Sequence, residues 1–446
     1  MNLFKKYIGD LFVTLRFYIV AGVCIIIFTL SFFLPLFFPL AKIIFVAFLL
    51  LVAADYFFLF IAGKKPVAER LVSDRLSNGD INTIVLSVTN NSSYFAAMKI
   101  IDELPFQFQE RNFSIQKHFL PRQQLKVSYT VKPAERGSYF FGNILLYVQS
   151  RQGFVVRRHV ISAQETVSVY PSFINLRNYQ LISQATIQGN GNKRMRKIGQ
   201  SMEFEQIKDY VNGDDIRTIN WKATARKGTL MVNNYVDEKS QQVYCIIDKG
   251  RLMKMPFEGL SLLDYAINST LALSNVCLQK QDKIGLISFS NKMGSLIAAD
   301  RKPVQRENIL QALYKEKTAY LESDFEMLYL QVRHKIKQRS LLILFTNFES
   351  VNGLKRQVAY LRSIARHHLL LVVFFENTAL NKLSGADAFN IDDVYVKAIA
   401  EKFVYEKKLV VKELQKYGIS SMLTSPQKLT INTINKYLQL KAQQAV

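Results

Sequence analysis

The side chains best suited to chemistry gather in one charged stretch of the sequence. Acids and bases alternate with apolar residues between Glu203 and Glu238, and this stretch holds the chain's single tryptophan. The residues that we expect to contact a partner are Glu203, Glu205, Tyr210, Asp214, Asp215, Arg217, Asn220, Trp221 and Arg226. Guanidinium and carboxylate groups form paired hydrogen bonds that fix geometry, so this stretch can shape a surface for another protein.

The arginines of this stretch have acidic neighbours. We expect Arg217 and Arg226 to form bidentate ion pairs with them. The candidate acids are Glu203, Glu205 and Asp209. Two interpretations stay open: the charges form a surface that recognises a partner, or they form an internal network that only orders this segment.

The local pattern predicts a helix just before the motif Gly213-Asp214-Asp215. The apolar residues at helical spacing are Phe204, Ile207, Tyr210 and Val211. Gly213 suits the end of that helix, and Asp214 suits the N-cap of the next one. We expect Trp221 to anchor the segment on the apolar face of the sheet that follows.

The composition points away from an enzyme and towards anionic partners. None of the five histidines lies beside a serine or cysteine in a catalytic motif, and the three cysteines sit in apolar runs without CxxC spacing. The formal charge is +23. Such an excess favours phospholipid, nucleic acid or an acidic protein. We expect membrane lipid and protein partners, and no nucleic acid.

Two apolar runs near the N-terminus predict a transmembrane hairpin over residues 1–63. The runs Phe17–Leu34 and Ile43–Ala62 are each long enough to cross a hydrocarbon core of roughly 30 Å. Lysines flank both outer ends, so the positive-inside rule places the soluble domains in the cytoplasm, at the cytoplasmic (inner) membrane. Asp55, within the second run, is a functional candidate because acids inside membranes are costly; alternatively, it faces the interface or a partner helix.

Residues 64–171 predict an antiparallel, immunoglobulin-like β-sandwich. Apolar alternation marks the strands, and Asn- and Gly-rich turns separate them. The predicted strands are Thr83–Thr89, Lys126–Lys132, Ile144–Val148, Phe154–Val160 and Val167–Pro171. Both a recognition module and a spacer fit this segment.

Residues 172–240 form a linker and the charged insertion. In its first part, Ser172–Gln200, we expect a flexible loop whose cations can meet lipid headgroups. These cations are Lys193, Arg194, Arg196 and Lys197.

Residues 241–446 alternate apolar strands with amphipathic helices, which predicts a mostly parallel sheet covered on both faces. The predicted strands are Val243–Ile247, Ile284–Phe289, Ser340–Phe345 and Leu369–Phe375. The predicted helices are Leu260–Gln279, Gln305–Tyr314, Phe325–Lys337 and Leu354–Arg366, with further helices over Glu401–Val446. Ligands bind at the carboxyl ends of such strands, where this chain places Asp248, Ser288–Ser290 and Thr346-Asn347.

These features closely resemble a bacterial membrane protein family called domain of unknown function 58. The resemblance rests on the run from Glu203 to Arg226, on Val169-Tyr170-Pro171, on Asp248, Gly250, Arg251 and Met253, and on the late helix Ile431–Lys441 with Tyr437. It covers nearly the whole chain. It implies a von Willebrand factor A-like domain from about Gln241 onward and an association with MoxR-type AAA+ ATPases, and no catalytic activity is established for the family.

A von Willebrand A-like domain implies a metal site with the motif Asp-x-Ser-x-Ser. At the corresponding positions this chain has Asp248, Gly250 and Leu252. Ser323 stands at the threonine position, and the second acidic position is Thr346-Asn347 or the later Glu349. Both serine ligands are absent, so we expect at most weak magnesium binding and no other cofactor. Alternatively, Asp248 caps the helix that follows or binds loop backbone.

The expected fold is a membrane-anchored multidomain chain: a two-helix transmembrane hairpin, an antiparallel β-sandwich and an α/β von Willebrand A-like (Rossmann-like) domain. The expected function is a non-enzymatic scaffold that recruits a MoxR-type AAA+ ATPase for assembly or remodelling of a membrane or envelope complex. The alternative is a metal-dependent binding protein or hydrolase centred on Asp248.

Overall fold

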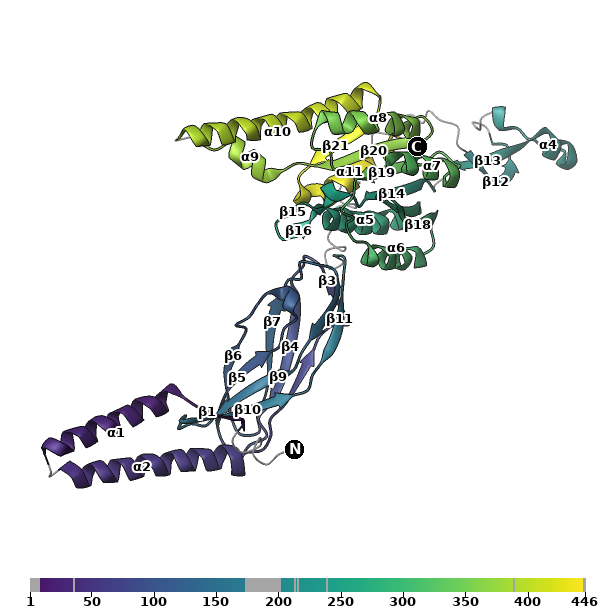
Figure 1. Ribbon diagram of the computed structural model, residues 1–446. Coiled ribbons are helices and arrows are strands. Elements are labelled where there is room, and N and C mark those ends of the chain that lie inside the picture. Colours follow the sequence, from purple (N-terminus) through teal and green to yellow (C-terminus); the bar gives the residue numbers. More distant parts are fainter. Residues whose placement is uncertain are drawn as a thin grey trace. The chain divides into compact units, whose positions relative to one another are not determined.

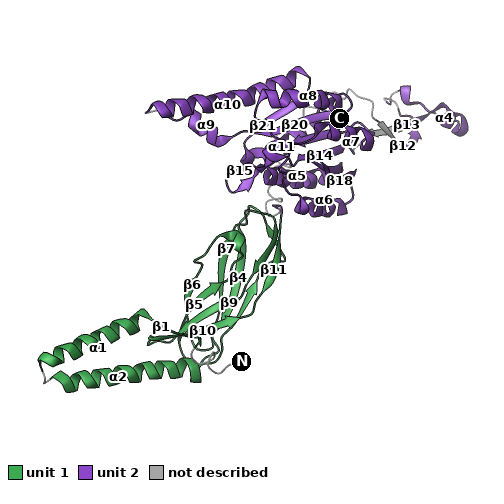
Figure 2. Ribbon diagram, in the orientation of Figure 1, with its two compact units in different colours: residues 1–170 green, residues 171–446 purple. Residues whose placement is uncertain are grey.

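The computed structural model describes residues 9–34, 37–172, 202–211, 214, 216–237, 240–387 and 390–443 (Figure 1). Side chains are not described for 202–205 and 234–237. The chain divides after Tyr170 into two compact units (Figure 2). The cations expected to meet lipid, at positions 193–197, lie outside the described residues.

The first unit begins with two apolar helices, α1 (Leu15–Phe33) and α2 (Phe38–Phe57), and a π-helical turn extends α2 to Ala62. Both helices are long and apolar enough to cross a bilayer. The second begins five residues before the predicted run because Pro39 lies in its first turn, where a proline is tolerated. At about 1.5 Å per residue, its 25 residues are longer than a hydrocarbon core of roughly 30 Å, so its last turns can lie outside the core.

Three mostly antiparallel sheets form the rest of this unit, and only β3 and β11 pair in parallel among its described strands. Its strands are β1 (Leu11–Val13), β2 (Val67–Leu71), β3 (Arg75–Ser77), β4 (Asn82–Thr89), β5 (Ala96–Asp102), β6 (Ile115–Phe119), β7 (Gln124–Val131), β8 (Gly137–Phe141), β9 (Ile144–Gln149), β10 (Val155–Ile161) and β11 (Glu165–Tyr170). They pair as β1-β10-β9-β5-β6, β2-β4-β7 and β3-β11-β8. Side chains from all three sheets share one core, which makes the unit β-sandwich-like.

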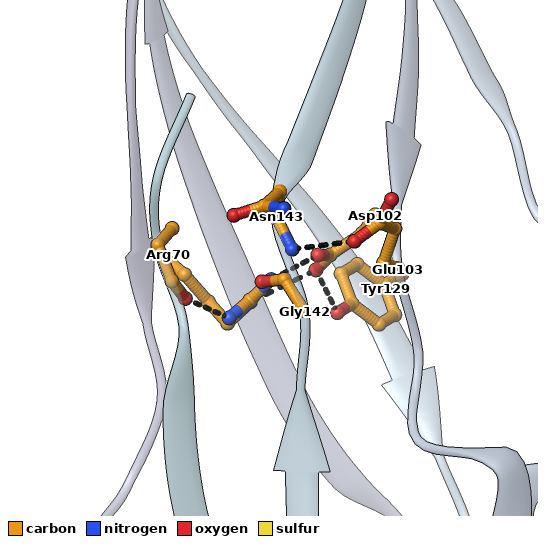
Figure 3. A network of polar contacts seen from close by, with 7 residues as sticks. Arg70, Asp102, Glu103, Tyr129, Gly142 and Asn143 are labelled. Carbon is orange, nitrogen blue, oxygen red and sulfur yellow. Dashed lines mark hydrogen bonds and ion pairs between the residues drawn. The ribbon is translucent and has the colours of Figure 1, made fainter. Parts of the chain in front are cut away.

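A buried ion pair crosses this core (Figure 3). Arg70 of β2 donates through Nε to Asp102 Oδ2 at 3.1 Å and through Nη2 to the Gly142 carbonyl at 3.1 Å. The Tyr129 hydroxyl donates to the same Asp102 oxygen at 2.5 Å. Burial, together with the charge of Asp102, raises the pKa of Tyr129 well above its usual range, so Tyr129 stays a neutral donor. The network therefore ties β2, β5 and β7 together.

Asp55 joins the second apolar helix to the sandwich. Its Oδ2 accepts hydrogen bonds from the backbone nitrogens of Phe154 and Val155, and its Oδ1 accepts one from the Ser150 hydroxyl. Arg157 also donates to the Leu59 carbonyl at 2.7 Å. The sequence suggested a functional acid here, but all of these contacts are to the neighbouring β-turn and its flanks, so Asp55 serves as a structural joint.

The second unit contains a six-stranded sheet. Its strands are β14 (Gln242–Asp248), β17 (Lys283–Phe289), β18 (Met293–Asp300), β19 (Leu341–Phe345), β20 (Leu369–Phe375) and β21 (Ser420–Thr424). The spatial order is β18-β17-β14-β19-β20-β21, and only β18 runs antiparallel to its neighbour. In chain order this is 3-2-1-4-5-6, the doubly wound order whose switch point lies between β14 and β19.

Helices cover both faces of this sheet (Figure 1). They are α5 (Leu262–Gln279), α6 (Val304–Lys315), α7 (Phe325–Lys335), α8 (Val351–Ala365), α9 (Thr378–Ser384), α10 (Ile391–Lys416) and α11 (Leu429–Ala442). Helices α7, α8 and α10 share one core with the sheet. Helix α5 packs on the opposite face, against β14 and β17, and α11 lies beside α5.

The tail differs from its prediction. Helix α10 begins at Ile391, ten residues before the predicted helical tail, because a capping box between Asn390 and Asp393 starts it there. The tail also adds the parallel strand β21, which was not predicted. Helix α11 is fixed to the sheet unit by Asp282, which accepts a hydrogen bond from the Tyr437 hydroxyl and pairs with Lys441 Nζ at 2.6 Å.

The charged insertion forms a small hairpin. Strands β12 (Met202–Asp209) and β13 (Met231–Asp237) pair antiparallel, and helix α4 (Trp221–Lys227) lies between them in sequence. The helix predicted before position 213 is therefore wrong. The spacing of Phe204 and Ile207 fits a helix, but a bulge between Phe204 and Gln206 shifts the strand register instead.

Candidate functional site

Asp248 ends β14 at the switch point of the sheet, and three donors hold its carboxylate. Its Oδ1 accepts hydrogen bonds from the Gly250 backbone nitrogen at 2.8 Å and from the Ser323 hydroxyl. Its Oδ2 accepts one from Thr346 Oγ1 at 2.7 Å. Asp248 is only 5% exposed, and this burial raises the pKa of its carboxyl. The hydrogen bond from Gly250 corresponds to the alternative in the sequence analysis, in which Asp248 binds loop backbone.

Asn347 lies one residue beyond Thr346, at the end of the neighbouring strand β19. Its Oδ1 accepts a hydrogen bond of 2.5 Å from Lys407 Nζ of α10. Burial lowers the pKa of Lys407 to about 8, and the charge of Glu349 opposes this shift. Sequence reasoning missed Lys407 because it lies in one more charged helix; the only signal was the lysine pair Lys407-Lys408 before the apolar run 409–411.

The structure thus brings Asp248 and Ser323 together, but this set of donors does not fit a divalent metal. Both Asp248 oxygens already accept from hydroxyl or amide groups, and a lysine ammonium group holds the Asn347 oxygen. A Cβ atom on Gly250 would lie 2.2 Å from Ser323 Oγ, so Ser323 fills the space that a serine ligand there would need. Magnesium and calcium prefer several carboxylate or carbonyl oxygens, and among the predicted ligands Asp248, Ser323 and Asn347 only Asp248 supplies a carboxylate.

Two cavities flank Asn347 and Glu349. The smaller, of about 140 Å³, includes Asp248 and Ser323 in its lining and is edged by Arg251 and Arg356. The larger, of about 260 Å³, is mostly apolar and includes Lys407. The carboxyl edge of the sheet is therefore concave on both sides of the Asn347–Lys407 contact.

The second candidate site is the hairpin, where the observed ion pairs differ from the predicted ones. Asp209 pairs with Lys227 at 2.9 Å, and Asp214 pairs with Lys208 at 2.9 Å. Both pairs lie within the hairpin segment. Arg217 and Arg226 are exposed. Asp215 and the side chains of Glu203 and Glu205 lie outside the described parts of the chain.

Other residues that were predicted to contact a partner form hydrogen bonds within the hairpin. Asn220 is the N-cap of α4: its Oδ1 accepts from the Ala223 nitrogen at 3.0 Å, and its Nδ2 donates to Asn233 at 2.8 Å. The Tyr210 nitrogen donates to the Leu230 carbonyl at 2.8 Å. Asp214, predicted as an N-cap, instead accepts from the preceding Val211 nitrogen at 3.0 Å. These bonds fix where α4 starts.

Trp221 does not anchor the hairpin on a sheet. It occupies the first position of α4 and is 69% exposed, so the prediction that it is buried is wrong. Helix α4 is too short for its other residues to cover the large indole ring of Trp221. Other exposed apolar side chains of the hairpin are Ile207, Val211, Ile216 and Leu230. An exposed group of this kind on a soluble surface is typical of a contact site for another protein.

Residues 206–386 match the family model described as "Protein of unknown function DUF58". The matched family is DUF58. Most of the hairpin, Asp248, Ser323 and Asn347 lie inside the DUF58 segment, whereas Lys407 lies beyond it. The uncharacterized protein YeaD of Bacillus subtilis is 20% identical over 128 residues, which cover 29% of this chain and 32% of YeaD. The chain thus spans about a third of the length of that relative.

Two solved structures give weaker similarities. The CARDB domain of a Pyrococcus furiosus protein is 15% identical, with a TM-score of 0.19, over 24% of this chain and 89% of that domain. The conserved hypothetical protein BatB of Bacteroides thetaiotaomicron is 11% identical, with a TM-score of 0.27, over 44% of this chain and all of BatB. With scores this low, neither similarity carries an argument about function.

Proposed function

We propose that this protein is a non-enzymatic, membrane-anchored scaffold that recruits a MoxR-type AAA+ ATPase for assembly or remodelling of a membrane or envelope complex. The observation that carries the proposal is the exposed ring of Trp221 within the DUF58 segment. Tryptophan and arginine are the side chains most enriched among residues that dominate binding energy at interfaces. Arg217 and Arg226 belong to the same hairpin and are exposed, so aromatic and cationic contacts can combine there.

The strand order and the apolar helices also support the proposed role. The strand order 3-2-1-4-5-6 with an antiparallel edge strand favours a von Willebrand A-like domain for the second unit. The two apolar helices favour an anchor in the inner membrane, and the lysines beside them favour cytoplasmic soluble units. In the sequence, an immunoglobulin-like sandwich separates the proposed anchor from the sheet unit.

The state of Asp248 favours binding over turnover. A general base or nucleophile uses a lone pair directed at its substrate, whereas the two oxygens of Asp248 already accept three hydrogen bonds from the protein. The same donors argue against the metal-dependent alternative at this residue. The Asp248 site therefore serves to hold the ends of β14 and β19 in place.

The test is affinity purification of the tagged full-length protein from native membranes after chemical cross-linking, followed by mass spectrometry. Wild type is compared with Trp221→Ala and with Phe106→Ala, a matched control that removes an aromatic ring 85% exposed in the first unit. We expect an AAA+ ATPase cross-linked near the hairpin in wild type and the control, and its loss from Trp221→Ala. Equal recovery with Trp221→Ala, or no ATPase from abundant intact protein, would overturn the proposal.

A further inference from the structure

The larger cavity at the carboxyl edge of the sheet has the form of a small-molecule site. Five separate elements contribute its apolar wall, which includes Phe257, Phe375, Leu380, Phe403 and Leu423. These residues come from β15 (Pro256–Phe257), the end of β20, α9, α10 and β21. A concave apolar space with a few polar groups is the usual form of a ligand pocket.

A lysine ammonium group forms the polar end of this cavity. Lys407 Nζ donates one hydrogen bond to Asn347 Oδ1, the single hydrogen bond recorded for it within the described residues. An ammonium group carries three donors. Removing such a charge from water is costly unless an anion compensates it.

The acids of the cavity do not supply this compensation. Glu376 Oε1 accepts a hydrogen bond from Asn381 Nδ2 at 2.8 Å. Glu349 is near enough to act on the pKa of Lys407, but its effect is smaller than that of burial. Among the described residues, neither acid forms an ion pair with Lys407. Both acids line the wall of the cavity, so they would repel a ligand that carries several negative charges. We therefore expect a ligand with a single negative charge.

We propose that this cavity binds a small apolar carboxylate. The hydrocarbon part packs against Phe375, Leu380 and Phe403, and the carboxylate accepts hydrogen bonds from the free donors of Lys407. Charge-assisted hydrogen bonds of this kind are among the strongest in proteins. The site is distinct from the Trp221 surface, so it does not rest on the proposed scaffold function.

The experiment uses the full-length protein in lipid nanodiscs and three probes of one shape. These are 4-phenylbutyrate, the neutral 4-phenylbutanol and the cationic 4-phenylbutylamine, titrated by calorimetry with empty nanodiscs as the blank. The variants are Lys407→Met, which keeps an unbranched apolar stem, and Lys412→Met, a control at an exposed lysine of the same helix. A third variant, Leu380→Trp, fills the apolar end and leaves Lys407 in place.

We expect 4-phenylbutyrate to bind wild type and Lys412→Met equally. We expect its affinity to fall at least about tenfold in Lys407→Met, the usual effect of losing a hydrogen bond to a charged group, and in Leu380→Trp. Bound 4-phenylbutyrate should also slow acetylation of Lys407, measured by mass spectrometry, and leave that of Lys412 unchanged. Equal affinity for the acid and the alcohol, an unchanged affinity in Lys407→Met, or no binding to wild type would overturn the proposal.

Discussion

The Oδ2 atom of Asp55 lies 2.8 Å from the backbone nitrogen of Phe154. One carboxylate of the second apolar helix thereby accepts hydrogen bonds from the amide just before β10 and from the first amide of β10, and Ser150 donates to it from the other side of the turn. Backbone amides that bond a carboxylate fix both distance and direction. The second apolar helix and the sandwich of the first unit are therefore joined at this turn.

Replacing Asp55 by alanine should loosen this joint. The amides of Phe154 and Val155 would lose their acceptor, and leaving buried donors unpaired costs about 1–3 kcal/mol. We expect both amides to exchange hydrogen at least about tenfold faster, measured by hydrogen exchange and mass spectrometry in nanodiscs. Asp55→Asn keeps one acceptor oxygen, so its exchange rates should lie between those of wild type and Asp55→Ala. Asp74→Ala, at an exposed acid, should exchange as wild type does. Unchanged exchange in Asp55→Ala would contradict the structural role.

The buried network of the sandwich gives a graded prediction. Asp102→Ala leaves the Arg70 guanidinium group buried without its carboxylate, which typically costs about 3–5 kcal/mol. Tyr129→Phe removes one hydrogen bond to the same carboxylate and should cost only about 1 kcal/mol. The measurement is the free energy of opening of β4 and β5, obtained from native-state hydrogen exchange. If Tyr129→Phe were as harmful as Asp102→Ala, the ion pair would not be the main contribution.

The contact between Gly250 and Ser323 can be tested by a double-mutant cycle. Gly250→Ala places a Cβ atom against Ser323 Oγ, so it should destabilise the second unit by about 1–3 kcal/mol, as overpacking does. Ser323→Ala should relieve part of this effect, with a coupling energy of about 0.5–3 kcal/mol between the two changes. Calorimetric unfolding of the full chain measures both. Additive effects would mean that the two side chains do not compete for this space.

Magnesium should leave the unfolding temperature of the second unit unchanged. Asp248 and Asn347 already have protein donors at their oxygens, so the ion would have to displace hydroxyl, amide and ammonium groups. The comparison is wild type with Asp248→Asn, each with and without magnesium chloride, by the same calorimetry. A stabilisation by magnesium that disappears in Asp248→Asn would restore the metal-dependent alternative.

Lys407 predicts a rise in stability with pH. Its pKa in the folded chain is lowered to about 8, whereas an unperturbed lysine titrates near 10.4. Between these values the unfolded chain binds more protons than the folded chain, so stability increases as the pH rises from about 8 to about 10. Lys407→Met should remove this part of the pH dependence, and Lys412→Met should keep it. The difference in unfolding temperature between variant and wild type, measured across that range, is the readout; a difference independent of pH would contradict the buried ammonium.

The sequence alone predicted the elements whose residues are strongly apolar. The two N-terminal helices and strands β14, β17, β19 and β20 are continuous apolar runs, and their pattern does not depend on distant contacts. The sequence analysis missed β2 and β6. In β2 a charged residue, Arg70, faces the core, and in β6 most residues are polar and exposed. Such strands are defined by their partners in the sheet rather than by their own periodicity.

The sequence likewise predicted some features of the candidate sites, whereas others depended on the tertiary structure. Asp248, Ser323 and Asn347 could be placed near one edge from sequence, because the carboxyl ends of parallel strands meet there. Tertiary structure alone decided that Ser323 bonds Asp248 directly, that Lys407 comes from a helix 60 residues later to hold Asn347, and that Trp221 stays exposed. Each of these depends on which side chain fills a space between distant segments, and packing across such distances leaves no local pattern in the sequence.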